Sequence, residues 1–346
     1  MKNFKVTIIV PMYNVEAYIE EAIDSVIGQS IFHEVELIII DDCSTDLSFQ
    51  LAEQKSKQYP TNINLFQQSV NRGVSASRNM GLKHASGEYV FFLDSDDVLP
   101  SYAIEKMYNA ATRSNADLIT APFQHLIDGE LVPLKMMKIS PLSKEGFINL
   151  EEEPQILYSI WSCGKLYKKS LLRGLRYPED INFGEDQPFT ITSMLRAKKI
   201  YNVADATYYV RPRPGSITRS GQSTKAIKSS IQVWRIVEKR IDSSSVDDKE
   251  GLKVFYFNSC LMRDIWGPVR QVLYGNNLSE RQLTLSAFLN WVTELSNTYI
   301  NISIDNFKSI FGEIGEVFGD LDTQSQQLLI ALLKTVKSNI GTRTIT

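Results

Sequence analysis

The sequence is poor in the residues on which several classes of protein depend. Among 346 residues it has three cysteines, which lie far apart, and three histidines. Cysteines this few and this widely spaced argue against a disulfide framework and against a zinc site. A reducing compartment, the cytoplasm, is therefore the expected location. The cysteines are Cys43, Cys163 and Cys260.

Long apolar runs and a strong net charge are also missing. No run approaches the ~20 apolar residues of a membrane-spanning helix, and the first ten residues lack the basic and apolar regions of a signal peptide. The formal net charge is −3, so the composition does not indicate nucleic acid as a partner. Membrane contact would then be peripheral, at the inner face of the cell membrane.

Two phosphate-binding signatures are absent as well. No G-x-G-x-x-G follows the first apolar run, and no G-x-x-x-x-G-K-[ST] occurs, which weakens the dinucleotide-dehydrogenase and P-loop interpretations. Short apolar runs alternate with helical patterns, as in a parallel α/β sheet. The expected strands are residues 6–10, 36–40, 89–93 and 117–121. The expected helices are residues 15–27 with Asn14 as cap, a helix capped by Asp46, and residues 75–85, 101–113 and 188–196.

The last third of the chain has a different character. Beyond Ser220 proline is almost absent, with only Pro268, and long amphipathic stretches follow one another. These stretches predict an all-helical domain. They are residues 227–241, 252–272, 280–295 and 325–336. The predicted organisation is therefore a catalytic domain over residues 1–220 and a helical domain over residues 221–346.

Carboxylates follow two of the expected strands. Asp41 and Asp42 come after the second, and Asp94, Asp96 and Asp97 after the third. Ligands of open α/β sheets bind at the carboxyl ends of the strands. The sheet therefore predicts that these acids converge, although about 50 residues separate them in sequence.

The chemistry of these acids suits a nucleotide and a hard cation. Asp94 and Asp96 flank Ser95 in a D-x-D pattern, and carboxylate oxygens are ligands for Mg²⁺ or Mn²⁺. A carboxylate of Asp41 or Asp42 could accept the N3–H of uracil or bind ribose hydroxyls. The alternative for both groups is ordinary turn chemistry, in which Asp and Ser end strands and begin helices.

Two further segments carry polar groups at helix starts. Arg78 lies about one turn into a helix that follows Gly73, so it could reach a nucleotide or simply face solvent. Glu185 and Asp186 follow Gly184 and open another helix. Asp186 is a candidate general base, although acids at a helix N-terminus are also favoured by its dipole alone.

Together these segments resemble the family 2 glycosyltransferases. The resemblance covers roughly residues 5–215 and is closest to bacterial inverting members with a GT-A fold that decorate wall teichoic acids or build capsule and other surface glycans. Its segments, in the order and spacing of the family, are residues 10–14, 41–46, 71–79, 93–97 and 184–186.

The resemblance implies roles for the donor-binding residues. The nucleoside pocket would be lined by Pro11, Tyr13, Asp42, Asn71 and Arg78, with Asp41 and Ser95 beside them. Asp42 would meet the uracil and Asp94 the ribose. Asp96, with Asp94 beside it, would bind the Mn²⁺ or Mg²⁺ ion that bridges the donor diphosphate.

The resemblance also implies roles at the acceptor side. Asp186 would be the catalytic base and Glu185 would contact sugar or acceptor. A loop that contains Arg211, Arg213 and Ser216 would close over the pyrophosphate, where arginine suits the task. Trp161 and Lys165 fall in a region that forms part of the acceptor side in similar enzymes, although a core tryptophan is an equal alternative.

The implied function is an inverting transfer of a hexosyl or N-acetylhexosaminyl group from a UDP-sugar to a hydroxyl of a bacterial surface glycan. The acceptor would be a glycan, a polyol-phosphate or a lipid-linked molecule. A non-catalytic nucleotide-sugar-binding module and a metal-dependent nucleotidyltransferase are the alternatives. The C-terminal helices would join subunits into a homo-oligomer, pack within the fold or rest on a membrane, since Lys334, Lys337 and Arg343 follow the apolar residues 328–333.

Overall fold

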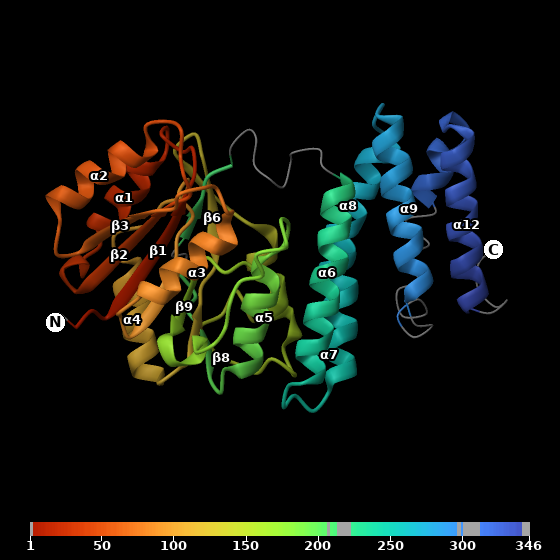
Figure 1. Cartoon of the computed structure of the whole chain (residues 1–346). Coiled ribbons are helices and arrows are strands. Elements are labelled where there is room, and N and C mark those ends of the chain that lie inside the picture. Colours follow the sequence, from red (N-terminus) through yellow and green to blue (C-terminus); the bar gives the residue numbers. More distant parts are fainter. Residues whose placement is uncertain (1–2, 206–207, 213–222, 296–298, 300–311, 341–346) are drawn as a thin grey trace. The chain divides into compact units, whose positions relative to one another are not determined.

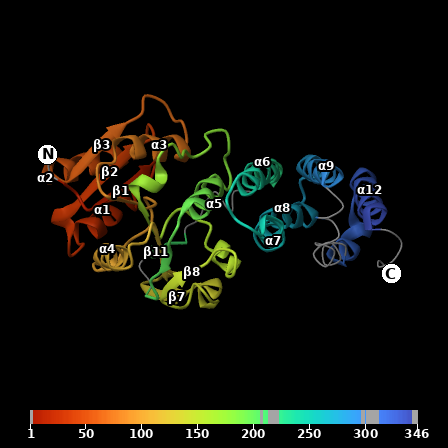
Figure 2. The ribbon, with the colours of Figure 1, turned by 90° about the horizontal axis from the view of Figure 1, so that it is seen from below.

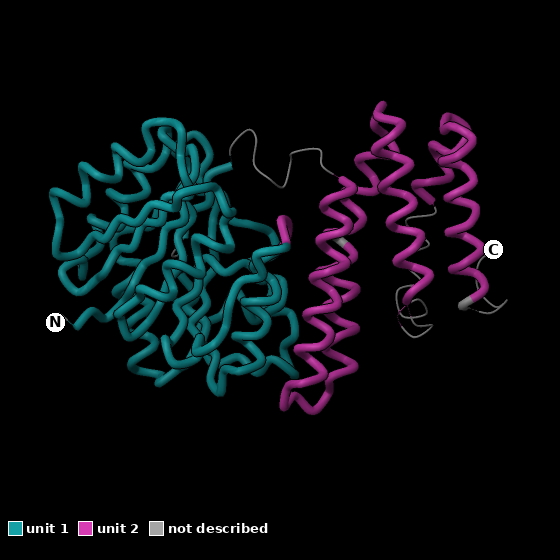
Figure 3. The backbone as a smooth tube through the Cα atoms, viewed as in Figure 1, with its two compact units in different colours: residues 1–180, 185–214 teal, residues 181–184, 215–346 magenta. Residues whose placement is uncertain are grey.

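The chain forms two compact units (Figure 3), seen in a computed structural model that describes residues 3–205, 208–212, 223–295, 299 and 312–340. The first unit comprises residues 1–180 and 185–214, and the second comprises residues 181–184 and 215–346.

An eight-stranded sheet forms the centre of the first unit (Figure 1), with strand order β3-β2-β1-β4-β9-β5-β10-β8. Buried β-branched and aromatic residues make its central strands, as expected for strands covered on both faces. The strands are β1 (Val6–Met12), β2 (Val35–Asp41), β3 (Ile63–Gln67), β4 (Tyr89–Phe92), β5 (Leu118–Thr120), β8 (Gly146–Ile148), β9 (Lys165–Lys168) and β10 (Ile200–Asn202). All four predicted strands are present.

The sheet is mostly parallel, as predicted. Strand β1 pairs in parallel with both β2 and β4, so the carboxyl ends of these three strands share one edge. The sequence did not predict β9, which runs antiparallel between β4 and β5. Because β9 begins at Lys165, this strand brings the segment before it to the same edge of the sheet.

Helices cover both faces of this sheet. Helix α3 lies against β1 and β2, while α1 and α4 lie on the opposite side of the strands (Figure 2). The helices of the unit are α1 (Ile19–Ile27), α2 (Ser48–Gln58), α3 (Val74–His84), α4 (Ala103–Ser114) and α5 (Asp186–Arg196). Single-turn helices η1 (Phe32–Glu34), η2 (Lys135–Lys138), η3 (Pro154–Tyr158) and η4 (Lys169–Leu172) join these elements.

The start of the first helix differs from the prediction. Helix α1 begins at Ile19 with Tyr18 before it, not after Asn14. Asn14 has a φ of 47°, and its side-chain oxygen accepts a hydrogen bond from the Thr45 backbone N–H at 2.8 Å. Asn14 therefore links the loop after β1 to the loop after β2 and does not cap a helix. Asp46 does serve the start of α2, since its carboxylate accepts from the Ser48 N–H at 2.9 Å.

A second, three-stranded sheet completes the first unit. Its order is β11-β6-β7, with β6 (Phe123–Ile127), β7 (Glu130–Pro133) and β11 (Tyr208–Val210). Strand β11 pairs in parallel with β6, and an isolated bridge joins Tyr209 to Val98, just past the acidic turn that follows β4. This small sheet therefore links the end of the first unit to that turn.

The second unit is helical. Helix α6 packs against α8 and α9, and α9 packs against α12. Trp234, Phe257 and Trp291 form part of an aromatic core between them. No helix in the described part of the chain is long and apolar enough to cross a bilayer. The elements are α6 (Ser223–Asp242), α7 (Lys249–Tyr256), the π-turn η6 (Phe257–Leu261), α8 (Met262–Leu273), α9 (Leu278–Glu294), η7 (Phe318–Asp320) and α12 (Thr323–Ile340).

Candidate active site at the carboxyl edge of the sheet

Asp42 shapes the loop that leads into α3. It directly follows β2 and is almost completely buried. One carboxylate oxygen accepts from the Arg72 N–H at 2.8 Å and from the Gln68 amide at 2.7 Å, and the other accepts from the Gly73 N–H at 2.7 Å. Gly73 has a φ of 87°, which favours glycine. Asp42 thus holds the turn of residues 71–73. This turn contains Asn71, which is predicted to contact the nucleoside.

Asp41 has a different environment from its neighbour. Its side chain is fully buried and accepts from the Ser44 N–H at 3.2 Å and from the Gln67 amide at 2.9 Å. These contacts stabilise the turn between β2 and α2. Of the predicted acid pair, Asp41 therefore lies inside the fold, where its bonds serve the turn, and its predicted contact with nucleotide stays untested.

Other predicted nucleoside contacts lie at the same edge with very different exposure. Tyr13 follows β1 and is 45 % exposed, whereas Pro11 is buried within that strand. Asn71 is exposed in the turn that Asp42 holds. A ligand at this edge could therefore reach the side chains of Tyr13 and Asn71.

The acidic turn after β4 divides its three carboxylates. Asp94 and Asp96 are partly exposed, while Ser95 and Asp97 are buried. Asp97 accepts from the Tyr208 hydroxyl at 2.7 Å and from the Arg211 N–H at 2.8 Å. Burial, with the nearby charges of Asp94 and Asp96, raises the pKa of Asp97 well above its usual range. Asp97 thus anchors the turn to β11, and the two exposed carboxylates are those of the predicted D-x-D pair.

Arg78 connects this turn to the candidate base. Its guanidinium donates from Nη2 to Asp94 at 3.0 Å and from Nη1 to Glu185 at 2.9 Å. It also lies over the Tyr177 ring, 5.3 Å from the centroid. The side chain is only 6 % exposed, so the alternative of a solvent-facing helix arginine is wrong. Two acids 91 residues apart in sequence meet on one cation.

Asp186 begins α5 beside this cluster. Its carboxylate is partly exposed and accepts from the Ser162 N–H at 3.4 Å. Burial is the largest cause of a rise in its pKa to about 7, to which the charges of Glu185 and Asp94 add and which Arg78 opposes. A carboxylate with a pKa near neutrality is suited to take up a proton at neutral pH.

The two residues predicted for the acceptor side are not equally accessible. Trp161 is partly exposed and packs edge-to-face on Phe123, with ring centroids 5.3 Å apart. Lys165 is completely buried, and its ammonium donates to Ser159 at 2.9 Å and to the Trp161 carbonyl at 2.8 Å. The Lys165 side chain therefore faces the fold and not an acceptor.

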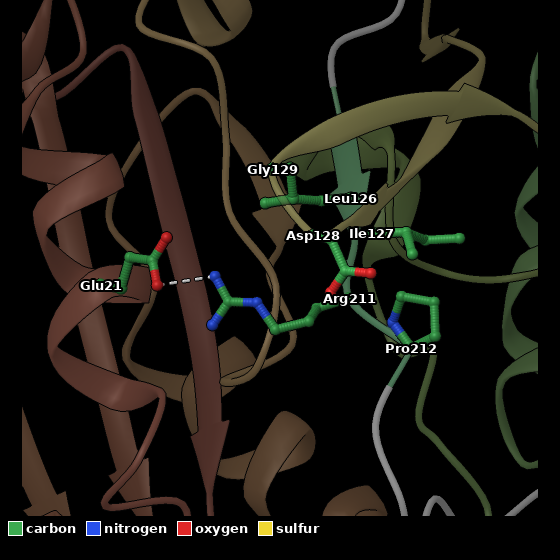
Figure 4. Close-up of a pocket in the computed structure, with 7 residues that line it drawn as sticks. All are labelled: Glu21, Leu126, Ile127, Asp128, Gly129, Arg211 and Pro212. Atoms are coloured by element: carbon green, nitrogen blue, oxygen red, sulfur yellow. Dashed lines mark ion pairs between the residues drawn. The ribbon is translucent and has the colours of Figure 1, made fainter.

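Arg211 reaches across to α1 (Figure 4). Its Nη2 lies 2.7 Å from the Glu21 carboxylate, and its guanidinium lies over the Tyr18 ring, 5.5 Å from the centroid. A pocket of about 420 Å³ surrounds this ion pair, lined by Glu21, Leu126, Ile127, Asp128, Gly129, Arg211 and Pro212. Arg213 and Ser216, the other predicted residues of this loop, lie outside the described residues.

A divalent cation would find two partly exposed carboxylates at this edge, Asp94 and Asp96. Within the described ranges no group of three or more His, Cys, Asp or Glu side chains is placed to hold a metal ion. Mg²⁺ usually takes one or two carboxylates plus phosphate oxygens and water. The two acids therefore fit an ion that is bound together with a diphosphate.

Several residues that build this site have no role assigned from the sequence, although Asn79 ends the predicted segment 71–79. Asn79 is buried in α3, where its amide donates to the Tyr177 carbonyl at 2.9 Å and its oxygen accepts from the Tyr177 N–H at 2.8 Å. Gln68 and Tyr208 support Asp42 and Asp97 in a similar way. Helix α3 thus carries two consecutive residues of the site, Arg78, which binds Asp94 and Glu185, and Asn79, which binds the Tyr177 backbone.

Comparison with known proteins agrees with the fold and the order of these segments. The family model described as "Glycosyl transferase family 2" matches residues 7–176. The chain is 36% identical over 209 residues to the poly(ribitol-phosphate) beta-glucosyltransferase of Bacillus spizizenii, covering 59% of this chain and 32% of that protein. It is 34% identical over 210 residues to the poly(ribitol-phosphate) beta-N-acetylglucosaminyltransferase TarP of Staphylococcus aureus, covering 60% and 62%.

Solved structures share the fold over nearly the whole chain. S. aureus TarS 1-349 in complex with UDP-GlcNAc superposes with a TM-score of 0.72 at 24% identity, covering 97% of this chain and 89% of that one. The mannosyltransferase PcManGT of Pyrobaculum calidifontis, in complex with GDP-Man and Mn²⁺, gives a TM-score of 0.55 at 16% identity, covering 96% and 87%. The matched region spans less than two thirds of the length of these two curated relatives.

Proposed function

Because residues 7–176 place this chain in glycosyl transferase family 2, we propose that it transfers a sugar from a UDP-sugar to an acceptor hydroxyl, with inversion at the anomeric carbon. The observation that carries the proposal is the cluster in which Arg78 joins Asp94 of the acidic turn to Glu185, next to Asp186. This cluster supports the proposal because it brings Asp94, the acid proposed to bind the donor, and the candidate base together at one edge of the sheet.

The donor would lie along the carboxyl ends of β1, β2 and β4. Exposed Tyr13 and Asn71 would contact the nucleoside, and Asp42 would fix the loop beneath it. The complex of TarS with UDP-GlcNAc supports UDP as the nucleotide. We also propose that Pro11, Asp41 and Ser95 contribute to the nucleoside pocket and that the loop of residues 211–216 contacts the pyrophosphate.

A divalent cation, Mn²⁺ or Mg²⁺, would be held by Asp96 with Asp94 beside it. When bound, it would neutralise charge that develops on the leaving diphosphate. The Mn²⁺ in the PcManGT complex supports a metal at such a site. Asp97 would not be a ligand, because Tyr208 and the Arg211 N–H already occupy its carboxylate.

Asp186 would act as the general base. Its partly exposed carboxylate, with a pKa raised to about 7 by burial and by Glu185, would take the proton of the acceptor hydroxyl as the oxygen attacks the anomeric carbon. Glu185 would orient the sugar or the acceptor while Arg78 balances its charge. The attack would come from the face opposite the leaving UDP, which gives inversion.

The names of the relatives support a poly(ribitol-phosphate) or related polyol-phosphate acceptor of a bacterial cell wall.

We propose the catalytic domain as residues 1–220 and the helical domain as residues 221–346. For the helical domain we propose contact with another subunit or with the inner face of the membrane through α12, where Ile330 is 43 % exposed and Lys334 and Lys337 lie on the same helix. Liposome flotation of the full chain, alone and after Lys334→Glu with Lys337→Glu, tests the membrane contact.

The activity itself is tested by product release. A panel of UDP-sugars is incubated with the protein and poly(ribitol-phosphate), with Mn²⁺, with Mg²⁺ or with EDTA. Release of UDP that stops with EDTA supports metal-dependent sugar transfer. Release of pyrophosphate would indicate a nucleotidyltransferase, and binding of UDP without any turnover would indicate a non-catalytic module. NMR of the product at its anomeric carbon decides between inversion and retention.

A further inference from the structure

Lys165 has an environment that its charge does not explain. It is the first residue of β9 and is completely buried. Its hydrogen bonds to described residues go to two neutral oxygens, Ser159 Oγ at 2.9 Å and the Trp161 carbonyl at 2.8 Å. Buried lysines usually pair with an acid. Burial lowers the pKa of Lys165 to about 7, although the nearby Asp186 charge opposes this change.

The carbonyl that Lys165 binds belongs to the peptide unit that faces Asp186. The Trp161 C=O and the Ser162 N–H are the two ends of one planar amide, and the Ser162 nitrogen lies 3.4 Å from Asp186 Oδ2. A cation at the carbonyl end polarises the amide and makes its N–H a stronger donor. The ammonium and the carboxylate are therefore connected through a single rigid group.

We propose that Lys165 is a positioning residue for Asp186, which it orients and keeps ionised through the Trp161–Ser162 peptide unit. The proposal rests on the proposed role of Asp186 as general base and adds a residue that does not touch substrate. Since the carboxylate must be ionised to accept a proton, a group that favours its charged form widens the pH range in which the base works.

The turn between Trp161 and Lys165 is held in place by contacts on either side of the Trp161–Ser162 peptide unit. Gly164 has a φ of 65°, and a Cβ there would lie 2.9 Å from the Phe123 ring. The next carbonyl, that of Ser162, accepts from the Tyr167 hydroxyl at 3.1 Å. Tyr167 packs edge-to-face on Phe189 of α5, the helix that Asp186 begins. The turn and the helix are thus fixed to each other on both sides of the amide.

The other charged and titratable groups near Asp186 include two acids and one cation. Glu185 and Asp94 raise its pKa, and Arg78 lowers it. Arg78 already serves Asp94 and Glu185. The remaining neighbours, Cys163 and Tyr167, are buried groups whose pKa values are raised well above their usual range, so they stay neutral. Lys165, whose own pKa is raised by the Asp186 charge, is then a second basic group near this carboxylate.

The direct test is the pKa of the Asp186 carboxyl, followed by ¹³C NMR in protein labelled at the aspartate carboxyl carbon. Asp186→Asn identifies its resonance. In Lys165→Met we expect the pKa to rise by roughly one pH unit, a tenfold change in the ionisation equilibrium. Lys168→Met, on the same strand but partly exposed, is the matched control and should leave it in place. An unchanged pKa in Lys165→Met overturns the proposal.

If Lys165→Met does not fold, Lys165→Gln gives the same comparison, because it keeps an N–H donor for the Trp161 carbonyl without the charge. Kinetics add a second arm. With saturating donor we expect kcat to fall roughly 10–100-fold, the loss typical of a supporting hydrogen-bond partner. The KM for donor should change less than about twofold, and the acidic limb of the kcat–pH profile should move upward with the NMR value. Lys165→Arg should recover part of kcat.

The two proposals fail in distinguishable ways. A wild-type protein that releases no UDP from any UDP-sugar contradicts the proposed function, while the NMR titration still decides the role of Lys165. Suppose instead that the wild type is active and that Lys165→Met has the same acidic limb of the kcat–pH profile and the same Asp186 pKa. The proposed function then stands, and Lys165 is rejected as a positioning residue.

Discussion

Nη1 of Arg78 lies 2.9 Å from the Glu185 carboxylate, although 107 positions separate the two residues in the chain. This ion pair brings Glu185, the neighbour of the candidate base Asp186, to α3, whose preceding residue Gly73 is held by Asp42. The other terminal nitrogen of Arg78, Nη2, donates to Asp94 at 3.0 Å.

Arg78→Met should destabilise the fold and abolish transfer. It leaves Glu185, which is 15 % exposed, without its cation, and removal of one partner from a buried pair costs about 3–5 kcal/mol. The free energy of unfolding is measured by urea denaturation. Arg72→Met is the matched control, since Arg72 and Glu179 form an exposed pair worth at most about 1 kcal/mol. Equal losses in the two variants would contradict a special role for Arg78.

Asp186→Asn should reduce kcat by roughly 10²–10⁴-fold, because the amide cannot accept the acceptor proton. Donor binding should persist, since Asp42, Asp94 and Asp96 are untouched. UDP release and calorimetric binding of UDP give the two values. Glu53→Gln on the outer face of α2 is the control and should keep wild-type kcat. Turnover by Asp186→Asn at the wild-type rate would exclude Asp186 as the base.

The raised pKa of Asp186 also predicts a pH dependence of stability. Its pKa is about 7 in the folded chain against 3.8 ordinarily, so the protonated carboxyl favours the folded state. That contribution is complete below about pH 4 and is lost as the pH rises through 7. Asp186→Asn is neutral at every pH. Its free energy of unfolding should therefore rise relative to that of the wild type by about 4 kcal/mol between pH 4 and 8, at about 1.4 kcal/mol for each unit of the pKa shift.

Thermal unfolding of both proteins across that range measures the difference. Asp180→Asn, which removes an exposed carboxylate from the loop before α5, serves as the control. A constant difference between Asp186→Asn and the wild type from pH 4 to 8 would show that the carboxyl titrates normally in the folded chain.

Asp96 and Asp97 are adjacent, yet we expect their removal to affect different properties, binding for Asp96 and stability for Asp97. Asp96→Ala should weaken the Mn²⁺-dependent binding of UDP with little change in stability, because the carboxylate is partly exposed in the turn. Asp97→Ala should cost about 1–3 kcal/mol, because it leaves the Tyr208 hydroxyl and the Arg211 N–H unsatisfied. Urea denaturation and calorimetry with and without Mn²⁺ separate the two effects. If Asp97→Ala kept full stability, the anchoring role would be wrong.

The α/β order, the four predicted strands and the helical C-terminal third could all be predicted from the sequence. These features follow from local patterns, since apolar runs and helical periodicity act over a few residues. The sequence also predicted that acids at the ends of β2 and β4 would share an edge, because parallel strands present their carboxyl ends together. Asp94 and Asp96 are predicted in this way, whereas Asp186 is predicted from the acid pair that follows Gly184 at a helix start.

The role of each polar group depends on contacts that form only in the folded chain. Asp96 and Asp97 have the same side chain, but Asp97 is buried and bonded to Tyr208, while Asp96 is partly exposed. The bond of Asp41 to Gln67 is likewise one that no local pattern contains. Strand β9 runs antiparallel between two parallel strands, and this insertion places the peptide unit before it against Asp186. The ionisation of a carboxylate depends on distant charges and on burial, so the Asp186 environment exists only once the chain has folded.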